Sequence, residues 1–179
     1  MPRLEVIESD AAADDVKPIY ADLESKMGKV INIFKGMGNS GAALNAYLSM
    51  SGALKQGHLS PDDREVIYLA VSEMNGCHYC VSAHTMISQK SGMSDQQIMA
   101  ARRFEAEDSK HQAMLTFVKR VIETKGFVSD DELSAVKDAG YTDGQIAESI
   151  AYIGLATYSN LFNHVFDTPL DFPEAPSLS

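Results

Sequence analysis

The stretch EVIYLAVSEMNGCHYCVSAH, residues 65–84, determines how this chain folds. It holds both cysteines of the chain, Cys77 and Cys80, and two of its five histidines. Cys77, Cys80 and His84 follow the i, i+3, i+7 spacing that places side chains on one face of a helix. We therefore expect the two sulfurs and the imidazole to lie side by side.

Glu65 joins this group only if the chain turns back on itself. Along one straight helix it would lie about 18 Å from Cys77. The dipeptide Asn75-Gly76 between them is a strong signal for a helix end and a turn. Glu65 is ten residues before this turn and His84 eight residues after it, so an antiparallel hairpin brings both to the same depth. The spacing predicts a row of carboxylate, imidazole and thiol, which can generate a thiolate.

Length and charge limit the class of protein. A chain of 179 residues suffices for one domain, which we expect over residues 1–179, with an N-terminal arm at 1–14 and a C-terminal tail at 167–179. The net charge of −10 argues against nucleic acid and anionic membranes as partners. The N-terminus does not resemble a signal peptide, and no run reaches the length of a membrane span. We expect a cytoplasmic protein.

Apolar residues recur at helical spacing nearly everywhere, and no pair of strands is evident. The sequence predicts an all-α bundle of about eight helices, with the C-x-x-C at the start of a central helix. Residues 29–38 are expected to be a connection. Helices are expected at 15–27, 39–56, from 61, from about 77 to 91, and after the caps at Ser94, Asp108, Ser129 and Thr142.

The two cysteines can form a redox pair. Cys77 follows the turn and lies at a helix N-terminus, where the partial positive charge favours a thiolate. His84 is one turn beyond Cys80 and can take its proton, while Glu65 orients the imidazole. Thiols at i, i+3 can also close into a disulfide. We assign Cys80 as the attacking sulfur and Cys77 as the more exposed resolving sulfur.

The same residues could also serve other kinds of site. A zinc site would need His78 beside Cys77, Cys80 and His84, but His78 points about 100° away from Cys77 on the helix. Covalent haem requires histidine directly after the second cysteine, where Val81 stands. We expect no metal and no cofactor. A non-enzymatic helical oligomer that uses this cluster for metal binding or redox sensing remains the alternative, and a disulfide oxidoreductase without a peroxide substrate is a third possibility.

Four further residues are candidates to border the same pocket: Tyr79 and His78 beside the cysteines, and Asn163 and His164 late in the last helix. The plain alternatives are packing for the tyrosine, and surface, interfacial or capping positions for the others. Methionines and aromatic residues on such a helical chain also favour a homo-oligomer.

The spacing Glu65-x11-Cys77-x-x-Cys80-x-x-x-His84 resembles the AhpD-like alkylhydroperoxidase family, within the carboxymuconolactone decarboxylase superfamily. LSPDDREVIYLAVSEMNGCHYCVSAHT at 59–85 is similar to the core of that family, and NHVFDTPLDFP at 163–173 to its end. One position departs from the well-characterised peroxidase branch: Tyr79 stands where that branch has histidine.

The resemblance implies an all-helical, antioxidant oxidoreductase that reduces hydroperoxides without haem or metal and assembles as trimers or hexamers. It implies that Cys80 is the peroxidatic sulfur, Cys77 the resolving one, and His84 with Glu65 the proton relay. It also implies that electrons come from a dithiol or a lipoylated carrier protein, with a peroxiredoxin served in turn. Lactone decarboxylation is not expected, because decarboxylases of the superfamily generally lack this cysteine pair.

Overall fold

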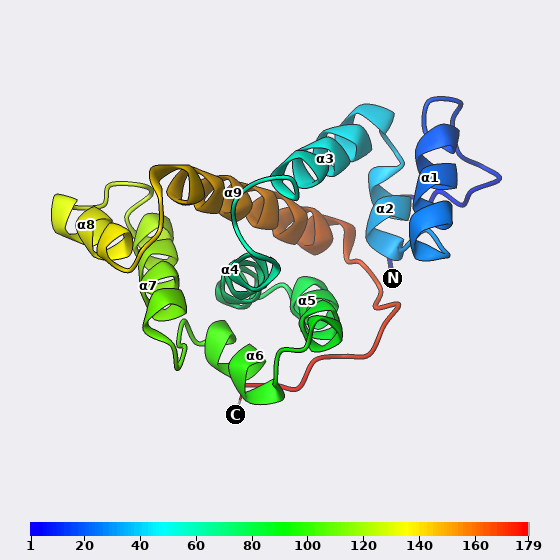
Figure 1. Ribbon diagram of the computed structural model, residues 1–179. Coiled ribbons are helices and arrows are strands. Elements are labelled where there is room, and N and C mark those ends of the chain that lie inside the picture. Colours follow the sequence, from blue (N-terminus) through cyan, green and yellow to red (C-terminus); the bar gives the residue numbers. More distant parts are fainter. Residues whose placement is uncertain (179) are drawn as a thin grey trace.

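The computed structural model describes residues 1–178, and these form helices and loops without any strand (Figure 1). The predicted all-α class is confirmed. The last residue of the expected tail, Ser179, lies outside the described residues. The helices are α1 (Lys17–Met27), α2 (Asn32–Met37), α3 (Gly41–Leu54), α4 (Pro61–Met74), α5 (His78–Ser91), α6 (Asp95–Arg102), α7 (Ser109–Glu123), α8 (Asp130–Asp138) and α9 (Asp143–Phe166).

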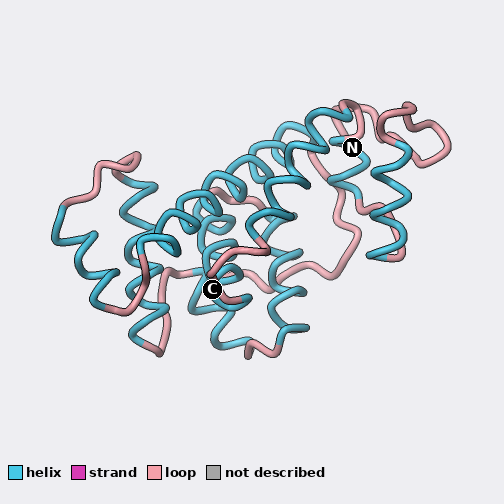
Figure 2. Tube along the Cα trace, turned by 45° about the horizontal axis from the view of Figure 1, so that its top comes forward, coloured by secondary structure: helices cyan, strands magenta, loops and turns pink. Residues whose placement is uncertain are grey.

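Helix α4 occupies the centre of the bundle, and α5, α6, α7 and α9 pack around it (Figures 1 and 2). Its sequence explains this position, since it is apolar over most of its circumference. An unbroken run from Val66 to Ser72 is buried. Helices α1 and α2 lie at one end of the molecule and α8 at the other, so α4 is the element to which the rest of the fold is attached.

The expectation of a plain connection at residues 29–38 was wrong, because α2 forms there. Ile33, Phe34 and Met37 are buried on one side of this short helix. Gly36 is also buried, and a Cβ on it would lie 2.5 Å from the ring of Phe166. A glycine-containing segment that looks like a loop is therefore helical, because contact with the end of α9 compensates for its weak propensity.

The helix starts follow the predicted capping signals. Ser60 caps α4 with Pro61 directly after it, and Asp63 completes a capping box. The helix expected from residue 39 begins at Gly41, after the cap Ser40, and ends at Leu54 rather than at residue 56. The remaining predicted caps are confirmed at Ser94, Asp108, Ser129 and Thr142.

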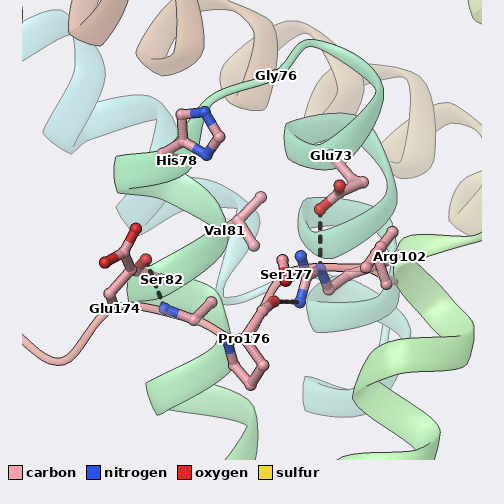
Figure 3. Close-up of a pocket in the computed structure, with 11 residues that line it drawn as sticks. Glu73, Gly76, His78, Val81, Ser82, Arg102, Glu174, Pro176 and Ser177 are labelled. Atoms are coloured by element: carbon pink, nitrogen blue, oxygen red, sulfur yellow. Dashed lines mark hydrogen bonds and ion pairs between the residues drawn. The ribbon is translucent and has the colours of Figure 1, made fainter.

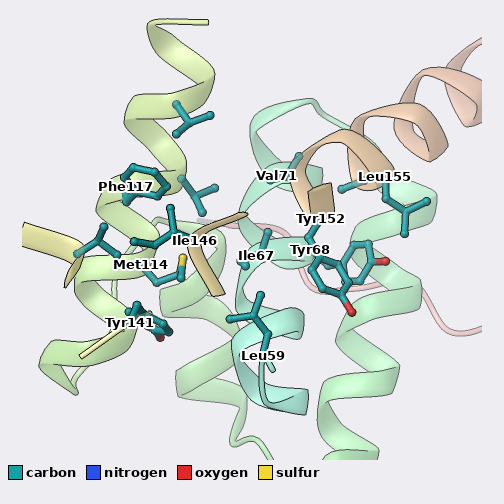
Figure 4. Packing of buried hydrophobic residues seen from close by; sticks show 14 residues of the cluster. Leu59, Ile67, Tyr68, Val71, Met114, Phe117, Tyr141, Ile146, Tyr152 and Leu155 are labelled. Atoms are coloured by element: carbon teal, nitrogen blue, oxygen red, sulfur yellow. The ribbon is translucent and has the colours of Figure 1, made fainter. Parts of the chain in front are cut away.

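Two buried clusters lie on either side of the central hairpin. The larger one joins α4 to α7 and α9 through residues such as Ile67, Met114 and Tyr152 (Figure 4). The second joins α1, α2 and α3 to the start of α5 and includes both cysteines. The cysteines therefore belong to an apolar core and are not surface groups.

After α9 the chain runs irregularly across α5 to α6 (Figure 1). Asp171 accepts a hydrogen bond from the backbone N–H of Asn32 at 3.0 Å. The backbone N–H of Ala175 donates to Ser82 Oγ at 3.0 Å, and the carbonyl of Pro176 accepts from Arg102 at 2.7 Å. These contacts fasten the C-terminal segment, residues 167–178, over the helix that carries the cysteines.

Candidate active site

The hairpin between α4 and α5 turns where the sequence indicated. Asn75 ends α4, Gly76 has φ of 68°, and the N–H of Cys77 donates to the carbonyl of Ser72 at 2.9 Å. A left-handed backbone of this kind is readily adopted by glycine. Asn75 Nδ2 also donates to Asn160 Oδ1 at 2.9 Å, which fixes the turn against α9.

The predicted contact between Glu65 and His84 is confirmed. His84 Nδ1 lies 2.8 Å from Glu65 Oε2, across the two arms of the hairpin. Both side chains are largely buried, with 13% of Glu65 and 15% of His84 exposed. An ionised carboxylate only accepts hydrogen bonds, so the proton of a neutral imidazole lies on Nδ1. This leaves Nε2 as a free acceptor, which is the state required of a base.

Two tyrosines surround this pair. The ring of Tyr68 stacks on His84, with centroids 4.0 Å apart and planes inclined by 14°. Burial raises the pKa of Tyr68 well above its usual range. Burial also raises the pKa of Tyr47 to about 12, and the Glu65 carboxylate adds to this effect although Ser159 opposes it. Both phenols therefore stay protonated at neutral pH, and Tyr68 covers one face of the imidazole.

Cys77 and Cys80 form a disulfide with their Cα atoms 5.4 Å apart. Cys77 is the N-cap of α5, and its Sγ accepts a hydrogen bond from the N–H of Cys80 at 3.3 Å. The expectation that Cys77 is the more exposed sulfur was wrong, since 1% of Cys77 and 4% of Cys80 are exposed. The reason lies in the fold: α2, α3 and the C-terminal segment pack over the start of α5.

Asn163 contributes a contact that the sequence indicated only in outline. Its Nδ2 donates to Cys80 Sγ at 3.1 Å, although the two residues are 83 positions apart. Asn163 is buried, with 4% exposed. Its position late in α9 was the available signal, but its partner depends on how α9 packs against α5.

The imidazole is not bonded to either sulfur in the disulfide form. Within residues 1–178, the one hydrogen bond of the His84 ring goes to Glu65. Cys80 and His84 are nevertheless four residues, about one helical turn, apart on the same face of α5, which is about 6 Å along the axis. The carboxylate of Glu65 and the imidazole of His84 are therefore already in contact in the disulfide form, about one turn of α5 away from Cys80.

Tyr79 covers the cysteines. Its hydroxyl donates to Asp171 Oδ1 at 2.8 Å, and its ring lies 4.7 Å from that of Phe172. Burial and then the negative charge of Asp171 raise the pKa of Tyr79 well above its usual range. Tyr79 is therefore a neutral donor that ties α5 to the C-terminal segment.

His78 and His164 lie elsewhere. His78 lines a cavity of about 560 Å³ between α5, α6 and the C-terminal segment, together with Ser82, Glu73 and Arg102 (Figure 3). The lining of this cavity includes neither cysteine, nor Tyr79, nor Asn163. His164 is exposed on α9. Of the four residues expected to border one pocket, His78 is therefore the one that lines this cavity.

Two kinds of feature are absent from residues 1–178. No group of three or more His, Cys, Asp or Glu side chains is placed to hold a metal ion. No helix is long and apolar enough to cross a membrane.

The chain is similar to several known proteins. Residues 41–123 match the carboxymuconolactone decarboxylase family, a range that includes the whole hairpin. The alkyl hydroperoxide reductase AhpD of Solibacter usitatus is 41% identical over 61 residues, which are 34% of each chain. The chain spans about a third of the length of the two curated relatives it matches.

Two solved structures share the fold over nearly the full length. An uncharacterised peroxidase-related protein from Ralstonia eutropha, described as an alkylhydroperoxidase AhpD core, aligns with a TM-score of 0.83 and 26% identity over 95% of this chain and 92% of its own. A peroxidase-related protein from Silicibacter aligns with a TM-score of 0.81 and 24% identity over 94% and 91% of the two chains. The second likeness concerns the fold alone.

Proposed function

Because the chain is an AhpD-like member of the carboxymuconolactone decarboxylase family, we propose that it is a thiol-dependent peroxidase that reduces hydroperoxides through Cys77 and Cys80. The observation that carries this proposal is the disulfide at the start of α5, with a hydrogen-bonded carboxylate and imidazole one turn away. A disulfide that can reopen, with a base beside it, is the equipment of a two-electron redox cycle.

The cycle begins with both cysteines reduced. The Cys80 thiolate attacks one peroxide oxygen, so that an S–O bond forms and the O–O bond breaks. The second oxygen leaves with the electron pair and takes up a proton to become an alcohol. The Cys77 thiol then displaces hydroxide from the Cys80 sulfenic acid, which gives the disulfide and, after protonation, water. An external dithiol returns two electrons by thiol–disulfide exchange and is itself oxidised.

In this cycle His84 accepts the thiol proton and returns it to the leaving oxygen. Glu65 holds the proton on Nδ1 and stabilises the imidazolium that forms, which is the general logic of a base oriented by a carboxylate. The 2.8 Å contact supports these roles.

Partners and assembly are further parts of the proposal. The reductant is a dithiol or a lipoylated carrier protein, and the cytoplasm is the compartment where such reductants are maintained. We also propose a homo-oligomer, trimeric or hexameric, because Ile150, Leu161 and Val165 are exposed along one helix, α9.

The test is peroxide consumption with dithiothreitol as the electron donor. Wild type should turn over, and Cys80→Ser should be inactive. Cys77→Ser is the matched control, because it keeps the attacking sulfur but cannot form the intramolecular disulfide. It should consume about one equivalent of peroxide and then stop in the absence of thiol. Equal steady-state rates in wild type and Cys80→Ser would end the proposal.

A further inference from the structure

The two sulfurs of the disulfide contact different hydrogen-bond donors. Cys77 Sγ accepts from the backbone N–H of Cys80 at the N-terminus of α5. Cys80 Sγ accepts from the side-chain amide of Asn163 on α9. The backbone by itself favours a thiolate at Cys77, since the unpaired N–H groups and the positive end of the dipole lie at the N-cap. A hydrogen-bond donor to Cys80 Sγ would act together with His84 against this preference of the backbone.

We propose that Asn163 is a catalytic residue whose side-chain amide donates a hydrogen bond to the Cys80 thiolate and thereby makes Cys80, and not Cys77, the sulfur that attacks. The attack itself rests on the proposed function. The hydrogen bond rests on the 3.1 Å contact between Asn163 Nδ2 and Cys80 Sγ.

The amide of Asn163 is held in one orientation. Thr168 Oγ1 donates to Asn163 Oδ1 at 2.6 Å, so the nitrogen of the amide is directed toward the sulfur. The backbone carbonyl of Asn163 accepts from the N–H of Asp167 at 2.9 Å, at the end of α9. The amide is therefore anchored on both its side chain and its backbone, and it needs no rearrangement when the sulfur becomes charged.

Burial gives this hydrogen bond its effect. Asn163 and Cys80 are each 4% exposed, so water does not compete with the amide for the sulfur. A disulfide sulfur is a weak acceptor, whereas a thiolate is a charged one, and hydrogen bonds to charged acceptors are about twice as strong. The contact therefore becomes stronger when the disulfide opens, and it favours the charge on Cys80. Asn163 gives up no proton in the step and emerges unchanged.

The test measures the two thiols separately. Cys77→Ser leaves Cys80 as the only thiol, and Cys80→Ser leaves Cys77. The rate of alkylation by iodoacetamide is followed against pH in each background, with and without Asn163→Ala. In the Cys80 background we expect the midpoint of the profile to move up by about one pH unit. In the Cys77 background we expect it to stay in place.

The rate of alkylation at a pH below the midpoint of the profile provides a second measurement. The thiolate population falls about tenfold for a shift of one unit, but a less stabilised thiolate is also a better nucleophile. We therefore expect alkylation of Cys80 to slow by about three- to fourfold.

Asn160 offers a matched control. It is a buried asparagine on the same helix, and it bonds to Ser72 and Asn75 instead of sulfur. Asn160→Ala should lower the unfolding temperature without moving the Cys80 midpoint. Thr168→Val keeps the amide of Asn163 but removes its anchor, so it should move the midpoint in the same direction by a smaller amount.

Two results would overturn the inference: an unchanged Cys80 midpoint in folded Asn163→Ala, or an equal shift in Asn160→Ala. If Asn163→Ala does not fold, Thr168→Val decides, and an unmoved midpoint there counts against the inference. Alkylation requires no peroxide, so the two proposals fail separately. A wild type that turns over peroxide but shows no shift on Asn163→Ala loses only the role of Asn163.

Discussion

Exchange of His111 for glutamine should make the stability of the fold less dependent on pH. His111 Nε2 lies 3.3 Å from Asp63 Oδ1, and its Nδ1 lies 2.7 Å from Asp108 Oδ2. Asp63 is buried and also accepts from the hydroxyls of Ser60 and Tyr141. The cluster joins the start of α4 to the start of α7.

The pKa values of His111 and Asp63 are shifted in opposite directions. The hydrogen bond to Asp63 raises the pKa of His111 to about 9, with a further contribution from Asp108, although burial opposes the shift. Burial would raise the pKa of Asp63, but hydrogen bonds from His111, Ser60 and Tyr141 together hold it well below its usual range. At neutral pH the imidazole is therefore charged and faces a charged carboxylate.

The sign and size of the effect follow from this shift. A raised pKa in the folded state gives stability that is complete below the unfolded value of 6.5 and is lost as the pH rises through about 9. The shift corresponds to roughly 3 kcal/mol at about 1.36 kcal/mol per unit. Because 25% of the His111 side chain is exposed, solvent screening reduces the effect, and we expect about 2 kcal/mol.

The assay is urea unfolding of wild type and His111→Gln at about pH 6 and about pH 9.5, with the disulfide oxidised in both. Glutamine can still hydrogen-bond to Asp63 but carries no charge, so it isolates the ionic part. Wild type should exceed the variant by about 2 kcal/mol at the lower pH, and this advantage should largely vanish at the higher one. If the unfolding free energy of wild type exceeded that of His111→Gln by the same amount at both pH values, the reasoning would be refuted.

Three further predictions concern the site and its cover. In Glu65→Gln the imidazole of His84 loses its carboxylate partner, so peroxide reduction should slow by roughly ten- to a hundredfold while the fold is kept. A rate equal to that of wild type would remove Glu65 from the proposed relay. Asp171→Ala frees Tyr79 and Asn32 from the C-terminal segment, so it should speed reduction of the buried disulfide by a small phosphine about tenfold. An unchanged rate would mean that this segment does not control access to the disulfide. Gly36→Ala should destabilise the protein by about 1–3 kcal/mol in thermal unfolding through contact with the Phe166 ring. Gly52→Ala is its control, because no atom lies within 4 Å of the added Cβ and the change should be neutral or stabilising.

Local signals in the sequence were sufficient for the central hairpin. Asn75-Gly76 marks the turn, and the similar distances of Glu65 and His84 from it, ten and eight residues, indicate that they meet. This inference works because both residues lie on regular helices of known rise joined by a short turn. The capping residues worked for the same reason, since each acts on backbone groups within three positions.

Features that depend on tertiary packing could not be predicted from local sequence signals. Helix α2 is stabilised by burial of Ile33 and Phe34, and its glycine suggested a loop. The exposure of Cys77 was misjudged, because segments from both ends of the chain cover it. Asn163 was named as a pocket residue, but no local rule connects it to a sulfur 83 positions away.

The site therefore has two parts with different requirements. The hairpin alone brings Glu65 to His84, so the proposed proton path is encoded locally. The donor to Cys80 comes from α9, and it exists only when α9 is packed against the hairpin. Partial opening of the end of α9 would leave the thiols and the base in place while it removes the amide, so that the helix N-terminus would favour Cys77 instead. The proposed selection between the two sulfurs is in this sense a property of the folded core, whereas the pairing of the two cysteines is a property of the local sequence.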